Sequence, residues 1–234
     1  MTASCSHSGF GINYGAMARY AIFSDIHNHT ERLARVLHHL AALQIDGYLQ
    51  LGDLGADALS LLDHLPIRHT FGNWEVSQLH QFPPERQSEI AAWPAQLAGD
   101  GWIASHASPV FPPECIDLAA TRRYMARHRP RWMQLFPSLL HDENAVWAAF
   151  AELASRGCRV AFHGHTHVQT VQQLDADNAF RRLEGPIISL APGTLTLVGV
   201  GSAGAPRDGN ALRCVIFDDD AFEVALLAIS DLSP

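Results

Sequence analysis

The sequence contains no lysine. All 16 of its basic residues are arginine, against 24 acidic residues, so the formal net charge is -8. Without a lysine amine the chain cannot form a Schiff base with a carbonyl substrate, and it cannot build a P-loop, which depends on a lysine. The acidic total also disfavours non-specific binding to the phosphate backbone of nucleic acids. The chemistry of this protein must therefore depend on other side chains.

Cysteine and long apolar runs are also scarce. The four cysteines, Cys5, Cys115, Cys158 and Cys214, are far apart and form no Cys-x-x-Cys pair, which argues against a disulfide framework and favours a reducing compartment. No stretch approaches the ~20 apolar residues that span a bilayer, and residues 1–18 lack the charged and apolar regions of a signal peptide. We therefore predict a cytoplasmic protein with no membrane partner.

Regular apolar patterns begin at about residue 19. Residues 1–18 are rich in glycine, serine and other small residues, which predicts a flexible N-terminal extension. Residues 19–234 are predicted to form a single α/β domain, because strands at 20–24, 48–51 and 67–71 alternate with helices at 31–43 and 56–65. The last of the later strands lie close together without helices between them, as antiparallel strands do. These later strands are predicted at 102–105, 159–162, 170–174, 187–190, 212–217 and 222–229.

The segment at about 107–157 has no strand character. It contains two helical stretches, at 116–127 and 143–155, and we predict that it is a helical insertion. Five of the sixteen arginines cluster between positions 122 and 131 of this segment, at 122, 123, 127, 129 and 131, so positive charge is concentrated in an acidic chain. The arginines form either a solvated helix face or a cap that helps to hold an anionic substrate.

Five short motifs each place a metal-binding side chain at the end of a predicted strand, where α/β folds build their sites. The ligand types are carboxylate, imidazole and amide oxygen without thiolate, which suits Mn, Fe, Zn or Mg. In the first and last motifs, ligands two residues apart would point the same way if the backbone were extended. The motifs are Asp25-Ile26-His27, Gly52-Asp53, Gly72-Asn73-Trp74-Glu75, Ser105-His106 and Gly164-His165-Thr166-His167.

The five motifs, in this order, resemble the pattern of the calcineurin-like metallophosphoesterases, and the similarity runs from Tyr20 to about Ile229. The resemblance implies a four-layer α/β/β/α sandwich of two mixed sheets flanked by helices. It also implies two divalent cations, Mn first and Fe, Zn, Ni or Mg as alternatives, with a hydroxide between them that attacks phosphorus. One cation would bind Asp25, His27 and His167, and the other Asn73, His106 and His165. Asp53 would bridge them, and Asp53, Asn73 and His106 would be catalytic.

Two later pieces, Ala191-Pro-Gly-Thr194 and Ala205-Pro-Arg-Asp-Gly209, resemble motifs of the small single-domain bacterial and archaeal branch of this family. That resemblance favours a phosphodiesterase and places Arg207 beside the substrate. Many family members have a histidine that protonates the leaving group where this chain has Trp74. Another group must then supply the proton, or leaving groups that depart easily are favoured. His29 is a further candidate for substrate binding.

Several alternatives remain open from the sequence. The chain could be a phosphomonoesterase acting on nucleotides, sugar phosphates or phosphoproteins, or a non-catalytic metal-binding scaffold of the same fold. A nuclease is disfavoured by the acidic total but is kept open by the arginine-rich segment.

The five tryptophans form no stacking array, so no base-binding platform is predicted. We predict that Glu75 braces a ligand or caps a helix rather than binding metal. The substrate is predicted to be a small phosphoester, and the oligomeric state is left open.

Overall fold

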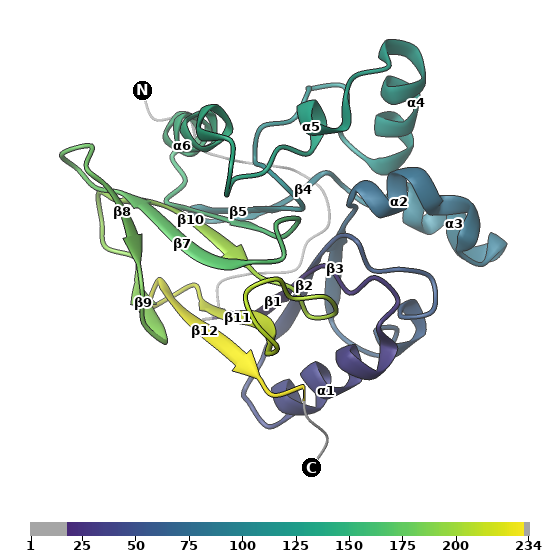
Figure 1. Ribbon diagram of the computed structural model, residues 1–234, viewed down its shortest axis with the longest axis horizontal. Helices are drawn as coiled ribbons and strands as arrows, with labels where there is room; N and C mark the ends of the chain where they lie inside the picture. Colours follow the sequence, from purple (N-terminus) through teal and green to yellow (C-terminus); the bar gives the residue numbers. More distant parts are fainter. Residues whose placement is uncertain (1–17, 232–234) are drawn as a thin grey trace.

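Two mixed six-stranded sheets face each other in the computed structural model, which describes residues 18–231 (Figure 1). The predicted flexible extension therefore lies almost wholly outside the described residues. The first sheet has the order β3 (Ile67–Thr70), β2 (Gly47–Leu51), β1 (Arg19–Phe23), β11 (Leu212–Asp218), β12 (Glu223–Ile229), β9 (Ile187–Ser189). The second has the order β4 (Gln96–Gly99), β5 (Trp102–Ser105), β6 (Val160–His163), β10 (Leu195–Val200), β7 (Gln169–Leu174), β8 (Phe180–Leu183).

Alternation along the strands separates the layers. In β1, Tyr20 and Ile22 point into an apolar cluster shared with the second sheet, whereas Ala21 and Phe23 belong to the cluster beneath the outer helix of the first sheet. This period of two follows from the pleat of a strand. Because β1 is buried on both faces, it reads as a continuous apolar run. The resulting four layers confirm the predicted α/β/β/α sandwich.

A helix covers the outer face of each sheet (Figure 1). Helix α1 (Thr30–Ala41) buries Leu33, Val36 and Leu40 against the first sheet. Helix α6 (Glu143–Arg156) packs on the second sheet through residues that include Phe150 and Leu153. Its N-terminus is capped by the Asp142 carboxylate, which accepts a 3.1 Å hydrogen bond from the Ala145 amide. It ends at Gly157, which has a φ of 66°, so glycine relieves the left-handed conformation that stops the helix.

The remaining helices gather at one edge of the sandwich. They are α2 (Asn73–Gln78), α3 (Pro84–Ala91), α4 (Leu118–His128) and α5 (Trp132–Leu135), with a short 3-10 turn at Leu79–Gln81 between α2 and α3 (Figure 1). A second 3-10 turn, at Leu59–Leu61, lies between β2 and β3 in the chain. As predicted, the segment between β5 and β6 contains only helices and loops. Its interpretation as an insertion, and the division into an extension and a single domain, stay predictions. Within the described residues no helix is long and apolar enough to cross a membrane.

Parts of the secondary structure differ from the predictions. The predicted helix at 56–65 is wrong, because only Leu59–Leu61 forms a 3-10 turn there. The segment is short and is followed by Pro66, and proline disfavours helical geometry in the residue before it. Ala58, Leu59 and Leu62 are buried nonetheless, so their spacing reflects the core rather than an α-helix. The elements not predicted from the sequence are α2, α3, α5, β4, β8, β10 and the 3-10 turn at Leu79–Gln81.

Candidate metal centre

All seven predicted metal ligands lie just beyond the ends of strands that run in parallel. In the first sheet, Asp25 and His27 follow β1, Asp53 follows β2, and Asn73 follows β3 as the first residue of α2. These three strands are mutually parallel, so their C-terminal ends meet at one edge. In the second sheet, where β5 and β6 are also parallel, the remaining three ligands follow the strand ends. They are His106, His165 and His167.

The backbone at these ligands is left-handed rather than extended. Within residues 18–231, nine residues other than glycine have a positive φ, and five of them are predicted ligands: Asp25, His27, Asp53, His165 and His167. The extended geometry considered for the two motifs with ligands two residues apart is therefore wrong. Each such residue costs on the order of 1–3 kcal/mol, and strain of this kind persists where the surrounding structure imposes it, often at functional sites. Here the amides of Ile26 and His27 both donate to the Asp53 carbonyl, at 2.9 and 3.0 Å.

Two glycines leave room for the carboxylates. A Cβ atom on Gly72 would lie 2.2 Å from Asp53 Oδ1, and a Cβ atom on Gly164 would lie 2.5 Å from Asp25 Oδ2. Both distances are far below van der Waals contact. This close approach explains why glycine precedes the ligands in the motifs that contain Asn73 and His165.

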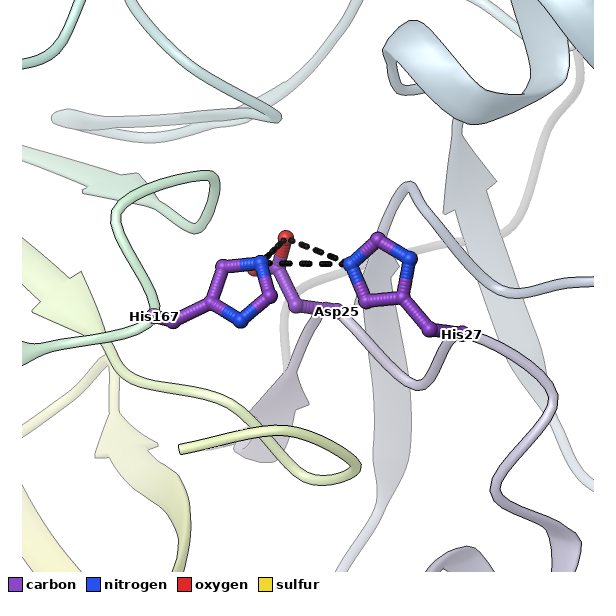
Figure 2. A group of neighbouring side chains, drawn as sticks. All are labelled: Asp25, His27 and His167. Atoms are coloured by element: carbon purple, nitrogen blue, oxygen red, sulfur yellow. Dashed lines mark hydrogen bonds and ion pairs between the residues drawn. The ribbon is translucent and has the colours of Figure 1, made fainter. Parts of the chain in front are cut away.

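The first group of ligands consists of Asp25, His27 and His167 (Figure 2). The Nε2 atoms of the two histidines are 3.2 Å apart, and Asp25 Oδ1 lies 3.3 Å from His167 Nε2 and 3.8 Å from His27 Nε2. His167 Nδ1 is 2.6 Å from the Ala205 carbonyl oxygen, so it must donate there. In the neutral ring, Nε2 then carries a lone pair that faces the carboxylate.

The second group contains His106, Asn73 and His165. His106 Nε2 lies 3.1 Å from Asn73 Oδ1 and 3.2 Å from His165 Nδ1. His106 Nδ1 is 2.7 Å from the Leu51 carbonyl oxygen and donates to it, which again leaves Nε2 free to bind a cation in the neutral ring. Two imidazole nitrogens and an amide oxygen thus converge at this point, whereas the first group has two imidazole nitrogens and a carboxylate oxygen.

Asp53 lies between the two groups. Its Oδ2 atom is 3.6 Å from Nε2 of His27 in the first group and 3.6 Å from Nε2 of His106 in the second. Its other oxygen, Oδ1, accepts a 2.7 Å hydrogen bond from the Trp74 amide. One oxygen is therefore fixed by the backbone, and the other faces both groups.

Glu75 holds these loops together. Its carboxylate is fully buried and accepts hydrogen bonds from the amides of Asp53, Leu54 and Gly72, at 2.9, 2.8 and 2.7 Å. Because the loops after β2 and β3 share this one acceptor, Asp53 and Asn73 keep a fixed relative position. As predicted, Glu75 braces the loop that carries Asp53 and, through its bond to Gly72, caps helix α2; that it binds no metal stays a prediction.

Comparison with known proteins agrees with this geometry. Residues 18–221 match the calcineurin-like phosphoesterase superfamily domain. The chain belongs to this superfamily. Among curated proteins, no significant match is found.

Solved structures of other members share the fold of this calcineurin-like phosphoesterase. A metallophosphoesterase from Sphaerobacter thermophilus superposes with a TM-score of 0.70 at 20% identity, over 92% of this chain and 89% of that one. An archaeal phosphodiesterase superposes with a TM-score of 0.50 at 11% identity, over 90% of this chain and 99% of that one. At these identities the likeness shows a common architecture. The family assignment identifies the protein as a member of a superfamily of metal-dependent phosphoesterases.

Neighbouring ionisable groups in the candidate centre of this phosphoesterase have pKa values shifted in different directions. Burial, together with repulsion from Glu75 and Asp25, raises the pKa of Asp53 to about 6, although His106 and His27 oppose the shift. Burial would also raise the pKa of Asp25, but its contacts with His167 and His27 outweigh that effect and lower the pKa below its usual range. Burial lowers the pKa of His106, but attraction to Asp53 and Asp25 raises it by more. The carboxylates therefore favour positive charge among them, which a bound cation would also supply.

The remaining candidates from the sequence lie around the two groups. The amide of Arg207 donates to the His167 carbonyl at 2.9 Å. Burial lowers the pKa of His167, but its contacts with Asp25 and the Ala205 carbonyl raise it by more, and the exposed guanidinium of Arg207 opposes this rise. His29 is exposed at the N-cap of α1, two residues beyond His27, and belongs to neither ligand group. The indole of Trp74 meets the His27 ring edge-on, with centroids 5.3 Å apart. Trp74 therefore shields His27 where many family members place an acid.

Other residues support the centre and are not predicted from the sequence. Ser202 donates a 2.7 Å hydrogen bond to the Asp25 carbonyl and accepts one of 2.6 Å from the Ala205 amide. It thus connects Asp25 to the carbonyl that orients His167. The ring of Phe136 packs against His106 and His165. No spacing in the sequence associates Ser202 or Phe136 with the motifs, because their roles depend on long-range contacts.

Proposed function

We propose that this protein hydrolyses phosphoesters, with phosphodiesters preferred, at a centre that holds two divalent cations. The observation that carries the proposal is the position of Asp53 Oδ2, 3.6 Å from one imidazole of each ligand group. A carboxylate oxygen in this place is suited to serve two cations at once. The first cation would be held by Asp25, His27 and His167, the second by Asn73, His106 and His165, and Asp53 would be shared.

The residues of the first group fit a cation because one buried carboxylate oxygen among them accepts no hydrogen bond. Asp25 Oδ1 is buried and has no hydrogen-bond partner, which is uncommon for a buried polar atom. The Nε2 atoms of His167 and His27 lie 3.3 and 3.8 Å from it. Since His167 already uses its Nδ1 proton at Ala205, a neutral His167 would place a lone pair against the carboxylate. A cation bound by all three atoms would remove this repulsion.

Two divalent cations bound here would lower the pKa of a water molecule into the physiological range and offset the negative charge of the phosphate. The side chains of the two groups would hold these cations, while the loops braced by Glu75 fix their spacing. Arg207 offers a guanidinium beside His167 to orient a phosphoryl oxygen. Oxygen and nitrogen ligands without thiolate agree with Mn first, and with Fe, Zn, Ni or Mg as alternatives.

The preference for diesters rests on Trp74 and on the pieces that resemble the single-domain branch. An indole has no proton that can be transferred near neutral pH, so this position cannot serve as a general acid. Substrates whose leaving group departs without protonation are therefore favoured. The alternatives are a phosphomonoesterase and a non-catalytic metal-binding scaffold.

The test uses chelator-stripped protein with Mn, Mg, Fe(II), Zn or Ni restored one at a time. We expect two metal ions per chain by elemental analysis and faster hydrolysis of bis-p-nitrophenyl phosphate than of p-nitrophenyl phosphate. Asp53→Asn should reduce turnover by more than about 100-fold, since even changes beyond the direct ligands cost about 10- to 100-fold at metal sites. Asp57→Asn, the same chemical change at an exposed position, should retain activity.

Three results would contradict parts of this proposal. Wild-type turnover by Asp53→Asn would show that Asp53 is not a shared ligand of two cations. Faster hydrolysis of the monoester would replace the phosphodiesterase by a phosphomonoesterase. Metal binding without turnover of either substrate would favour the scaffold.

A further inference from the structure

A pocket of about 390 Å³ opens beside the second ligand group. Asn73 and His165, two predicted ligands of the second cation, line it together with Ser77 of α2. The other lining residues are Trp132, Met133 and Phe136, on α5 and immediately after it. The pocket therefore connects the proposed reaction centre to an apolar wall built by the segment between β5 and β6.

The wall is aromatic and continuous from the ligands to the surface. Phe136 is 3% exposed, and its ring centroid lies 5.8 Å from that of His106 and 6.2 Å from that of His165. Trp132 continues the wall, with its ring centroid 5.8 Å from that of Phe136 and the ring planes 33° apart. Phe136 also packs against Phe111, with ring centroids 5.7 Å apart. The base of the wall is thus fixed by packing.

The outer part of the wall leaves apolar surface open. Trp132 is 44% exposed and Met133 is 74% exposed. A continuous apolar surface that adjoins a reaction centre is typical of a ligand-binding site rather than of a random solvent face. The lining residues include no carboxylate, arginine or lysine. The group that fits this pocket is therefore uncharged and has a flat apolar face that can lie against the aromatic wall.

We propose that this pocket binds an ester group of the substrate and selects a flat aromatic one, such as a nucleobase or an aryl ring. This inference rests on the proposed function, because the phosphate of the same substrate would lie at the metal centre. Trp132 supplies a face for stacking, and flat rings gain about 0.5–1.5 kcal/mol from such contacts beyond the burial of area. Trp132 is thus inferred to determine specificity.

The test compares two phosphonates that share a head group and differ in the attached group. Phenylphosphonate and methylphosphonate are not hydrolysed, so calorimetry on Mn-loaded protein measures their binding whether or not the protein has activity. We expect phenylphosphonate to bind about tenfold more tightly, a difference that aromatic contact and burial together can supply. Trp132→Ala should reduce this ratio to about one, and Trp132→Phe should restore most of it.

The matched control is Trp147→Ala. Trp147 lies on α6, is 49% exposed and lines a different pocket, so the phenyl to methyl ratio should stay at its wild-type value. Equal binding of the two phosphonates by the wild type, or an unchanged ratio in Trp132→Ala with intact circular dichroism, would overturn the inference. Absence of turnover together with an intact phenyl preference would overturn the proposed function and leave the pocket assignment standing.

Discussion

Replacing Glu75 by glutamine tests how the centre is held together. The carboxylate has no exposed surface and accepts three main-chain hydrogen bonds, two at Oε2 from Asp53 and Gly72 and one at Oε1 from Leu54. An amide has only one acceptor oxygen. If that oxygen takes the Oε2 position, the amide nitrogen faces the Leu54 N–H, and two donors are left unpaired in the interior.

The expected cost follows from these contacts. Hydrogen bonds to a charged group contribute about 1.5–3 kcal/mol, and an unsatisfied buried donor costs a further 1–3 kcal/mol or so. We therefore expect Glu75→Gln to lower the free energy of unfolding by about 3 kcal/mol, measured by urea denaturation of the chelator-stripped protein. Because the loops that carry Asp53 and Asn73 lose a shared anchor, the affinity for Mn should fall by about 10- to 100-fold.

Glu85→Gln is the control for this experiment, because Glu85 is exposed in the first turn of α3. It should change the free energy of unfolding by less than about 0.5 kcal/mol. The reasoning would be refuted if Glu75→Gln matched this control in both urea denaturation and Mn affinity. It would also be refuted if the loss of stability occurred without any loss of metal affinity, since the brace would then serve the fold alone.

Two further predictions concern the substrate and the pH. Arg207→Ala should raise KM about tenfold with little change in kcat, because it removes a charge-assisted contact to the phosphate. The control, Arg19→Ala, lies at the opposite end of β1 and should change neither constant. Unaltered kinetics in the Arg207 variant would show that Arg207 does not contact the substrate. Calorimetric Mn affinity should fall about tenfold or more per pH unit below pH 6, because a proton on Asp53, whose pKa is raised to about 6, must leave before a cation binds. Constant Mn affinity between pH 7 and pH 5 would contradict this.

The sequence predicts much of the architecture and the chemical types of the centre, but not its local geometry. Apolar runs identify β1 and β2 because those strands are buried on both faces, and helix periodicity identifies α1 and α6. The same logic is wrong at 56–65, where Ala58, Leu59 and Leu62 reach the core from a 3-10 turn. The family assignment from the motifs is confirmed. The roles of the individual ligands stay predictions.

Long-range contacts account for what the sequence does not predict. The left-handed residues Asp25 and His27 lie in a loop whose amides donate to the carbonyls of Gly52 and Asp53, which are distant in the chain. The aromatic wall combines Trp132 and Phe136 with Phe111, from before α4. A stacking array of regularly spaced tryptophans could be recognised in the sequence. This cluster of one tryptophan and two phenylalanines cannot, because folding brings its members together. Local propensity contains no information about either arrangement.

Because the proposed ligands are divided between the two sheets, metal binding would be coupled to the docking of one sheet on the other. Asp25 of the first sheet already accepts a 2.8 Å hydrogen bond from the His165 amide of the second. A cation shared by Asp25, His27 and His167 would add a strong bond across the same interface. Any cation that binds only this docked arrangement stabilises it by RT ln(1 + [M]/Kd), about 2.7 kcal/mol at a concentration 100 times Kd. The metal content of the cell would then help to set how often the two halves of the sandwich separate, and with it the lifetime of the protein.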